Sequence, residues 1–188
     1  MLLGETGAGK STFINYLYNY AKKHDFDSRE IIIPNKHFRG DSSISHNEND
    51  IGNNAESKTT QSKPYEFIPA FSFLDTPGLG DTRGIAQDQK NIDNIIQNAC
   101  NADLIHAIIL IVNGSTSRFT SQMEYVLKKI CGFFPDEFQK NLIVVFTNAN
   151  KAQCNFEPHV IKNIFNNWDQ SNVYHMQNDA FSDRKSVV

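Results

Sequence analysis

The chain is 188 residues long, enough to bury the core of one α/β domain, and we predict a single domain over residues 1–188. Its net charge of −3 and its pI near 6.0 leave no basic surface for a phosphate backbone, which argues against a nucleic-acid partner. The three cysteines form no C-x-x-C pair, which argues against a disulfide framework or a zinc site and predicts buried thiols in a cytoplasmic protein.

The first predicted element is a phosphate-binding loop at residues 4–12, which fits the pattern G-x-x-x-x-G-K-[ST]. It follows the apolar pair Leu2 and Leu3 and precedes apolar residues at helical spacing over residues 10–23, so the order of strand, loop and helix is the one that the motif requires. This context disfavours the alternative of an ordinary glycine-rich turn. The residues expected to contact a nucleotide are Gly4, Glu5, Thr6, Gly7, Ala8, Gly9, Lys10, Ser11 and Thr12.

Each part of this loop has a chemical role. The glycines let main-chain N–H groups approach the β- and γ-phosphates closely, because no Cβ stands in the way. Lys10 is expected to bind the same phosphates and to act in catalysis, and the hydroxyl of Ser11 is expected to ligate Mg²⁺.

The segments after the first helix predict a long connection with little regular secondary structure. The run from Ile31 to Ile33, stopped by Pro34, predicts either a short strand or an apolar anchor. Residues 40–63 hold few large apolar side chains and predict a long, mobile switch loop. Because only three residues precede the phosphate loop and no apolar helical face follows Asp183, we expect a domain truncated at both ends.

Two apolar segments, residues 65–68 and 71–74, predict strands, and the second one leads into Asp75-Thr76-Pro77-Gly78. A carboxylate at the tip of a buried strand, followed by a tight turn, suits a phosphate site. Asp75 can hold a Mg²⁺-bound water, and the N–H of Gly78 can meet the γ-phosphate. An ordinary Asx-Pro-Gly turn is the alternative, and the phosphate loop upstream disfavours it.

The remaining segments alternate between helix and strand, so the predicted fold class is α/β: a doubly wound, mainly parallel sheet flanked by helices. Helices are expected over residues 86–100, from about residue 120 and from Pro158, and strands over residues 104–112, 142–146 and 173–176. His106, inside the first of these strands, is expected to be a core histidine rather than a ligand. The segments expected on one rim of the sheet are residues 4–12, 75–78, 113–119 and 147–150.

In this order, the phosphate loop, residues 75–78 and residues 147–150 resemble the motifs of a septin-like P-loop GTPase. The chain is most similar to the immunity-associated, AIG-type GTPase family. Residues 75–82 read Asp-Thr-Pro-Gly-Leu-Gly-Asp-Thr, and residues 117–120 read Ser-Arg-Phe-Thr at a helix start, as the family's second switch and its additional box do. The resemblance covers nearly the whole chain and implies a G domain that binds GTP or GDP with Mg²⁺.

The resemblance also implies individual site residues. A threonine of the first switch completes the Mg²⁺ shell and takes part in catalysis, and Thr59 is the best match, with Thr60 second. Arg118 lies in the box where related GTPases pair face to face, so it is either an arginine finger of a homodimer or a solvated residue at a helix start. The residues that match the base-contacting loops are Thr147, Asn148, Asn150 and Asn178.

Two departures from the family pattern bear on function. Leu79 stands where Ras-like enzymes carry a glutamine that orients the attacking water, so intrinsic turnover should be slow. Asn150 stands where an aspartate usually accepts from guanine, and its amide offers one acceptor and a clashing donor. The preference between guanine, xanthine and adenine is therefore open, with Asp179 as a candidate for the missing carboxylate.

The leading hypothesis is a GTP-binding switch with slow, Mg²⁺-dependent hydrolysis, activated by nucleotide-dependent dimerisation. A non-hydrolysing scaffold is the first alternative, favoured by Leu79 and Asn150. A P-loop ATPase is the second. Against it, Asp75 is followed by Thr-Pro-Gly and not by the glutamate that many ATPases use as a base.

Overall fold

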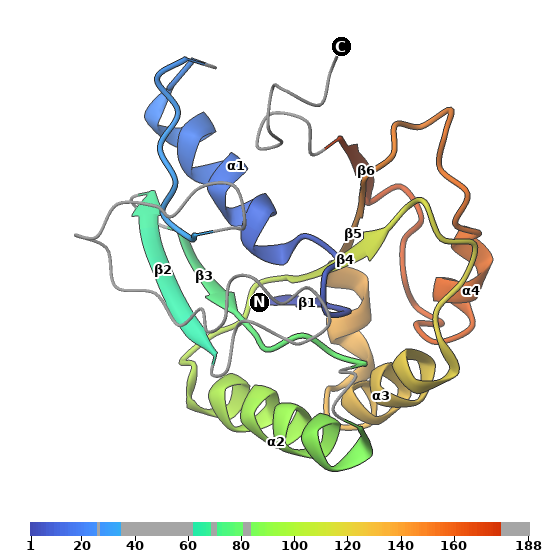
Figure 1. Ribbon diagram of the computed structural model, residues 1–188. Helices are drawn as coiled ribbons and strands as arrows, with labels where there is room; N and C mark the ends of the chain where they lie inside the picture. Colours follow the sequence, from blue (N-terminus) through green and yellow to red (C-terminus); the bar gives the residue numbers. More distant parts are fainter. Residues whose placement is uncertain (26, 35–61, 69–70, 81–83, 178–188) are drawn as a thin grey trace.

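The computed structural model describes residues 1–25, 27–34, 62–68, 71–80 and 84–177, in which strands and helices alternate along the chain (Figure 1). The strands are β1 (Leu2–Gly4), β2 (Lys63–Ile68), β3 (Phe71–Asp75), β4 (Ile108–Asn113), β5 (Leu142–Thr147) and β6 (Val173–Met176). The helices are α1 (Lys10–Lys22), α2 (Ile85–Asn101), α3 (Ser121–Cys131) and α4 (Pro158–Lys162), with a 3₁₀ helix, η1 (Asp136–Asn141), before β5.

Four parallel strands form the central sheet, in the order β1-β4-β5-β6. The apolar runs of β4 and β5 are almost entirely buried, as expected for inner strands covered on both faces. Among the described residues, β2 and β3 pair only with each other, as an antiparallel hairpin. The predicted fold class, a mainly parallel sheet flanked by helices, is confirmed.

β4 begins at Ile108 and not at residue 104, where the apolar run begins. A strand starts only where a neighbour can pair with it, and Ile108 is opposite Leu142 of β5. The preceding residues lie outside the sheet: Leu104 is 68% exposed, and His106 is exposed as well. The expectation of a core histidine is therefore wrong.

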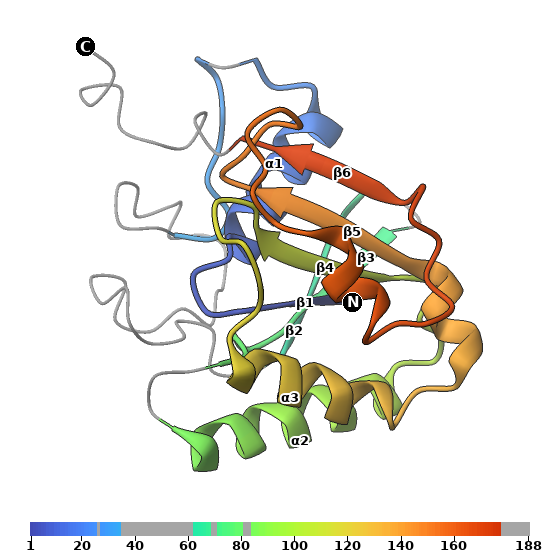
Figure 2. The same ribbon diagram turned by 90° about the vertical axis from the view of Figure 1, so that its right-hand side faces the viewer.

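The helices cover both faces of the sheet (Figures 1 and 2). α1 packs on one face, where Ile14 shares a buried cluster with Tyr65 of β2 and Val145 of β5. The β2–β3 hairpin lies beside β1, which β3 contacts (Figure 1). On the other face, α2 and α3 lie side by side and join α4 in the larger cluster, which includes Ile95 and Leu127. This layering leaves the carboxyl ends of the strands at one rim, where loops can form a site.

The helix expected from Pro158 is short. α4 ends at Lys162, and the chain continues through turns in which the N–H of Phe165 donates to the carbonyl of Ile161 at 2.9 Å. Phe165 and Trp168 are nevertheless buried, although they lie beyond the end of this helix. In the described ranges, no helix is both long enough and apolar enough to cross a membrane.

The three cysteines differ in burial. Cys100 is exposed, whereas Cys131 and Cys154 are half-buried, so the expectation of buried thiols is wrong for Cys100 and only partly met by the other two. Burial raises the pKa of the Cys131 thiol to about 12, because the thiolate would lose its hydration.

α1 holds the following segment by two asparagines one helical turn apart. Asn15 Oδ1 accepts hydrogen bonds of 3.0 Å from the N–H groups of Ile32 and Ile33, and its Nδ2 donates to the carbonyl of Ile33 at 2.9 Å. Asn19 Oδ1 accepts from the N–H of Glu30, and its Nδ2 donates to the carbonyl of Glu30. Ile32 and Ile33 are buried without forming a strand, so the segment is the apolar anchor.

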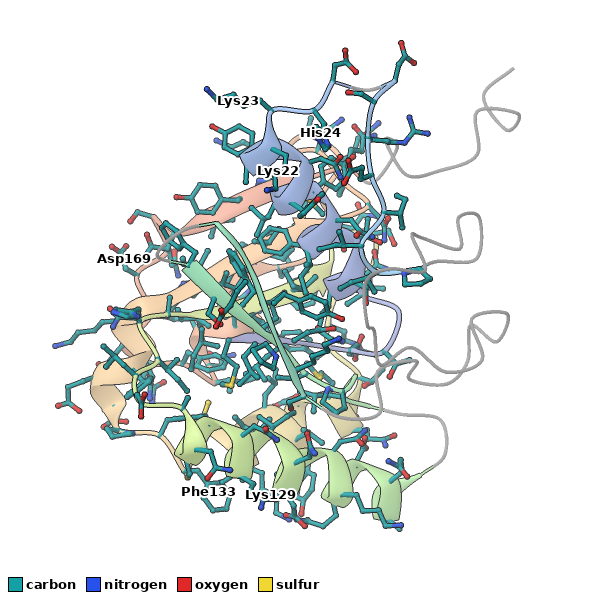
Figure 3. The ribbon with its side chains drawn as sticks, turned by 90° about the vertical axis from the view of Figure 1, so that its left-hand side faces the viewer. Lys22, Lys23, His24, Lys129, Phe133 and Asp169 are labelled. Atoms are coloured by element: carbon teal, nitrogen blue, oxygen red, sulfur yellow. The ribbon has the colours of Figure 1, made fainter. Side chains whose placement is uncertain are left out.

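The C-terminal end of α1 carries a basic group of side chains (Figure 3). Lys22, Lys23 and His24 gather there, at the end where the helix dipole favours positive charge. Lys23 adopts a left-handed conformation with φ of 58°, and its N–H donates to the carbonyl of Tyr20 at 3.1 Å. This cap ends the helix within a residue of the predicted boundary.

Candidate nucleotide-binding site

The phosphate loop joins β1 to α1 at the rim where β4 and β5 also end (Figure 2). Gly7 and Gly9 have φ of 78° and 99°, a region in which a side chain would be strained. Gly4 meets a different constraint, since a Cβ there would lie 2.4 Å from the carbonyl oxygen of Ile111. The glycines thus allow both the curl of the loop and its close approach to β4.

Lys10 points back into this loop and is only 7% exposed. Its Nζ donates hydrogen bonds to the carbonyls of Gly4 at 3.1 Å and of Glu5 at 3.2 Å. The ammonium group therefore lies at the mouth of the loop, where its charge can meet phosphate oxygens. It also closes the loop structurally, a second role that the motif by itself did not predict.

Residues 75–78 lie directly against the phosphate loop. The hydroxyl of Thr76 donates to the carbonyl of Leu2 at 2.6 Å, which holds the turn on the open edge of β1. The N–H of Leu79 donates to the carbonyl of Gly4 at 3.1 Å, and the N–H of Thr6 donates to the carbonyl of Leu79 at 2.9 Å. The two segments expected to share a phosphate are thus joined main chain to main chain.

Asp75 is buried at the end of β3, where its Oδ1 accepts from the N–H of Thr76 at 3.1 Å. Ser11 lies in the first turn of α1, so a hydroxyl and a carboxylate both come from elements that pack on β1. Hard oxygen donors of this kind suit Mg²⁺, which usually takes one or two protein ligands together with phosphates and water. In the described ranges, no group of three or more His, Cys, Asp or Glu side chains could hold a metal ion.

Gly78 is positioned from α2. The side-chain amide of Asn91, which is buried, donates to the carbonyl of Gly78 at 2.9 Å. A Cβ at Gly78 would lie 2.3 Å from Oγ1 of Thr6, so the glycine is needed for this close approach. Sequence reasoning missed Asn91, because an asparagine in the first half of a helix gives no signal of its distant partner.

Thr147 connects the loop after β5, which is expected to contact the base, to the phosphate loop. It is fully buried, and its hydroxyl donates to the carbonyl of Ala8 at 2.6 Å. Its position is therefore suited to holding the two loops together, and its contact with a base stays a prediction. Asn148, the next residue, is exposed and has φ of 55°, which turns the chain outward at the rim.

Asn150 is exposed, but its polar atoms are engaged in its own turn. Oδ1 accepts from the N–H groups of Ala152 and Gln153, each at 3.0 Å, and Nδ2 donates to Oε1 of Gln153 at 2.7 Å. The side chain thus shapes the loop that follows β5. Its part in reading a base stays a prediction.

The Arg118-Phe119-Thr120 box stands at the start of α3. Arg118 is exposed, while Phe119 is buried and its ring lies 4.8 Å from that of Phe156. The hydroxyl of Thr120 donates to Oε1 of Glu5 at 3.0 Å, a contact that sequence spacing could not predict. The box is therefore attached to the phosphate loop through Glu5.

Four expected site residues lie outside the described residues: Thr59, Thr60, Asn178 and Asp179. Most of the expected switch loop, residues 40–61, lies outside them as well. The chain before Asn178 is held by α1, since the hydroxyl of Tyr16 donates to the carbonyl of Gln177 at 2.9 Å. The residue that follows β6 and precedes Asn178 therefore lies beside α1.

Comparison with known families decides the identity. The family model of the AIG1 family matches residues 1–178. The chain belongs to the AIG1 family. No curated protein matches the chain.

Solved structures share the fold of this AIG1 family member at low sequence identity. A dimerization-deficient arginine-to-alanine mutant of Toc33 from Arabidopsis thaliana is 12% identical, with a TM-score of 0.55, over 97% of this chain and 70% of that one. Toc33 from Arabidopsis thaliana in complex with Mg²⁺ and GMPPNP is 14% identical, with a TM-score of 0.55 and the same coverage. A chain from the chloroplast translocon components atToc33 and psToc159, for whose GTPase activity dimerization is important, is 14% identical, with a TM-score of 0.58 over 97% of this chain and 69% of that one.

Proposed function

We propose that this AIG1 family protein binds guanine nucleotide with Mg²⁺ and hydrolyses GTP slowly, as a conformational switch. The observation that carries the proposal is the main-chain junction between the phosphate loop and residues 75–78, through Gly4, Thr6 and Leu79. A terminal phosphate bound in the loop would contact both segments. Loss of this phosphate on hydrolysis can therefore change the conformation of the chain beyond Gly78.

The residues around this junction fit the chemistry of phosphoryl transfer. Lys10 supplies a positive charge for the β- and γ-phosphates, and the glycines allow main-chain N–H groups to approach the same oxygens closely. Ser11 and Asp75 would hold Mg²⁺, directly and through water. The complexes of Toc33 with GDP and Mg²⁺ and with Mg²⁺ and GMPPNP support guanine nucleotide as the ligand.

Slow turnover is supported by the environment of Leu79. Its side chain is fully buried in the larger core cluster, where Ras-like enzymes carry a glutamine that orients water. The chain has no polar group at that position to bind an attacking water. This observation also favours a second candidate function, a scaffold that binds nucleotide without hydrolysing it.

Dimerisation across the nucleotide face is the proposed route to faster hydrolysis. Arg118 is exposed and stands two residues before Thr120, whose hydroxyl is bonded to Glu5 of the phosphate loop. We propose that its guanidinium contacts the nucleotide of a second copy. The dimerization of the structural neighbours is consistent with such a pairing.

The test is nucleotide binding and phosphate release by the purified protein. Fluorescent GDP and GMPPNP should bind in the presence of Mg²⁺, and Lys10→Ala should remove that binding. Lys22→Ala is a matched control, because Lys22 is exposed at the other end of the same helix (Figure 3). Binding of GMPPNP by Lys10→Ala with wild-type affinity would overturn the proposal. Phosphate release after addition of GTP separates a slow enzyme from a scaffold.

A further inference from the structure

The hydroxyl of Thr6 is an unexplained polar group inside the phosphate loop. Thr6 Oγ1 is buried and has no hydrogen-bond partner among the described residues. A buried hydroxyl without a partner costs roughly 1 to 3 kcal/mol, and such groups in folded proteins usually have a ligand or a functional reason. The hydroxyl therefore calls for a partner that binds in the loop.

The main-chain carbonyls around Thr6 already serve other donors. The carbonyl of Leu79 accepts from the N–H of Thr6 itself, and the carbonyl of Gly78 accepts from Asn91. The carbonyl of Glu5 accepts from both Lys10 and the N–H of Ala8. None of these carbonyls accepts a hydrogen bond from the hydroxyl of Thr6.

The direction of the hydroxyl is set by its contact with Gly78. A Cβ at Gly78 would meet Oγ1 of Thr6 at 2.3 Å and Cα of Thr6 at 2.8 Å, so the two residues touch. The N–H of Gly78 is the group expected to meet the terminal phosphate of a bound triphosphate. Thr6 Oγ1 therefore lies against Gly78, at the contact between the phosphate loop and residues 75–78.

We propose that Thr6 Oγ1 donates a hydrogen bond to an oxygen of the γ-phosphate, and so makes the site favour the triphosphate over the diphosphate. A hydroxyl can donate one hydrogen bond, and an anionic phosphate oxygen is a strong acceptor. The inference rests on the proposed guanine-nucleotide site and adds to it a residue that distinguishes the two nucleotide states. Because Thr6 also contacts Gly78, the same hydrogen bond would hold residues 75–78 against the loop.

The experiment compares Thr6→Val, which keeps the shape of the side chain, with Thr6→Ser, which keeps the hydroxyl. Dissociation constants are measured for GMPPNP and GDP in the presence of Mg²⁺. We expect Thr6→Val to weaken GMPPNP by about tenfold or more, the effect of losing a hydrogen bond to a charged group, and to leave GDP nearly unchanged. Thr6→Ser should bind both nucleotides as the wild type does.

A second measurement needs no nucleotide. Thermal melting of the unliganded protein should show Thr6→Val at least as stable as the wild type, because valine removes a buried polar atom that lacks a partner. Thr116→Val is the matched control, since Thr116 is exposed and its hydroxyl donates to the carbonyl of Asn113 on the same rim.

The outcomes separate this inference from the function on which it rests. If the wild type binds neither nucleotide, the proposed function fails. If the wild type binds both and Thr6→Val keeps the wild-type ratio of GMPPNP to GDP affinity, the assignment of Thr6 fails alone. If Thr6→Val does not fold, the same ratio measured for Thr6→Ala decides the question.

Discussion

The hydroxyl of Thr120 donates a hydrogen bond of 3.0 Å to Oε1 of Glu5, and so ties the start of α3 to the phosphate loop. Oγ1 of Thr120 in turn accepts a hydrogen bond of 3.1 Å from the N–H of Met123, which caps the first turn of the helix. The side chain of Thr120 therefore caps the start of α3 and fixes its position relative to the phosphate loop. Arg118 lies two residues before Thr120 and is therefore close to this attachment to the phosphate loop.

Replacing Thr120 by alanine should lower the stability of the protein. The loss of an N-cap costs about 1 kcal/mol, which corresponds to a fall of roughly 2 to 4 °C in the thermal midpoint of a domain of this size. Thr120→Ser retains a hydroxyl and should melt near the wild type. Equal midpoints for the alanine variant and the wild type would show that the cap contributes nothing.

Asn15→Ala should be more damaging, because three main-chain hydrogen bonds of Ile32 and Ile33 end on this one side chain. Leaving buried main-chain groups without partners should lower the free energy of unfolding by about 2 to 3 kcal/mol. Hydrogen exchange should show early loss of protection at the N–H groups of Ile32 and Ile33. Tyr20→Ala, at a residue 84% exposed on the same helix, should change stability by less than about 0.5 kcal/mol.

The variant Asn150→Asp tests whether residue 150 contacts the base of the nucleotide. From the sequence alone, the carboxylate should tighten GDP relative to XDP by about 1 to 3 kcal/mol. In the structure, Oδ1 of Asn150 accepts from Ala152 and Gln153, and an aspartate keeps both bonds. We therefore expect the ratio of GDP to XDP affinity to change by less than about fivefold, or about 1 kcal/mol. A tenfold increase in the ratio of GDP to XDP affinity would show that the side chain of residue 150 gives up its hydrogen bonds in the turn and binds the base.

Arg118→Ala tests the proposed dimer. The specific GTPase activity of the wild type should rise with protein concentration, and the variant should lose this rise while its affinity for GDP stays near the wild-type value. An arginine finger contributes on the order of 10³ to 10⁵ in rate. Lys128→Ala, which removes an exposed charge from α3, should keep the rise. Activity independent of concentration in the wild type would refute the model of activation by pairing.

Local pattern predicted most elements of the fold, because β-branched runs and helical periodicity carry their own signal. β5 and β6 begin and α1 begins where the sequence indicates. The start of β4 was wrong, since Leu104 belongs to an equally apolar run and only the availability of paired neighbours decides where a strand begins. Strand pairing depends on segments that are far apart in the sequence, and a local pattern carries no information about them.

The same limit applies to the candidate site. The phosphate loop and residues 75–78 were predictable, because their spacing reflects the ligand that they are expected to bind. Asn15 was not predictable, because a polar residue in a helix gives no sign of being buried against main chain 17 and 18 residues away. Asn91 and the link from Thr120 to Glu5 depend in the same way on tertiary contacts.

The hydrogen bond from Thr147 to the carbonyl of Ala8 makes the two halves of the candidate site mechanically dependent on each other. A substitution that alters the loop after β5 would also disturb the curl that surrounds the phosphates, so its effects should not add to those of changes in residues 4–12. Such a joint restricts how the protein can evolve. Variants of Asn148 and Asn150 can leave this joint in place, because both residues are exposed and neither takes part in the hydrogen bond between Thr147 and Ala8.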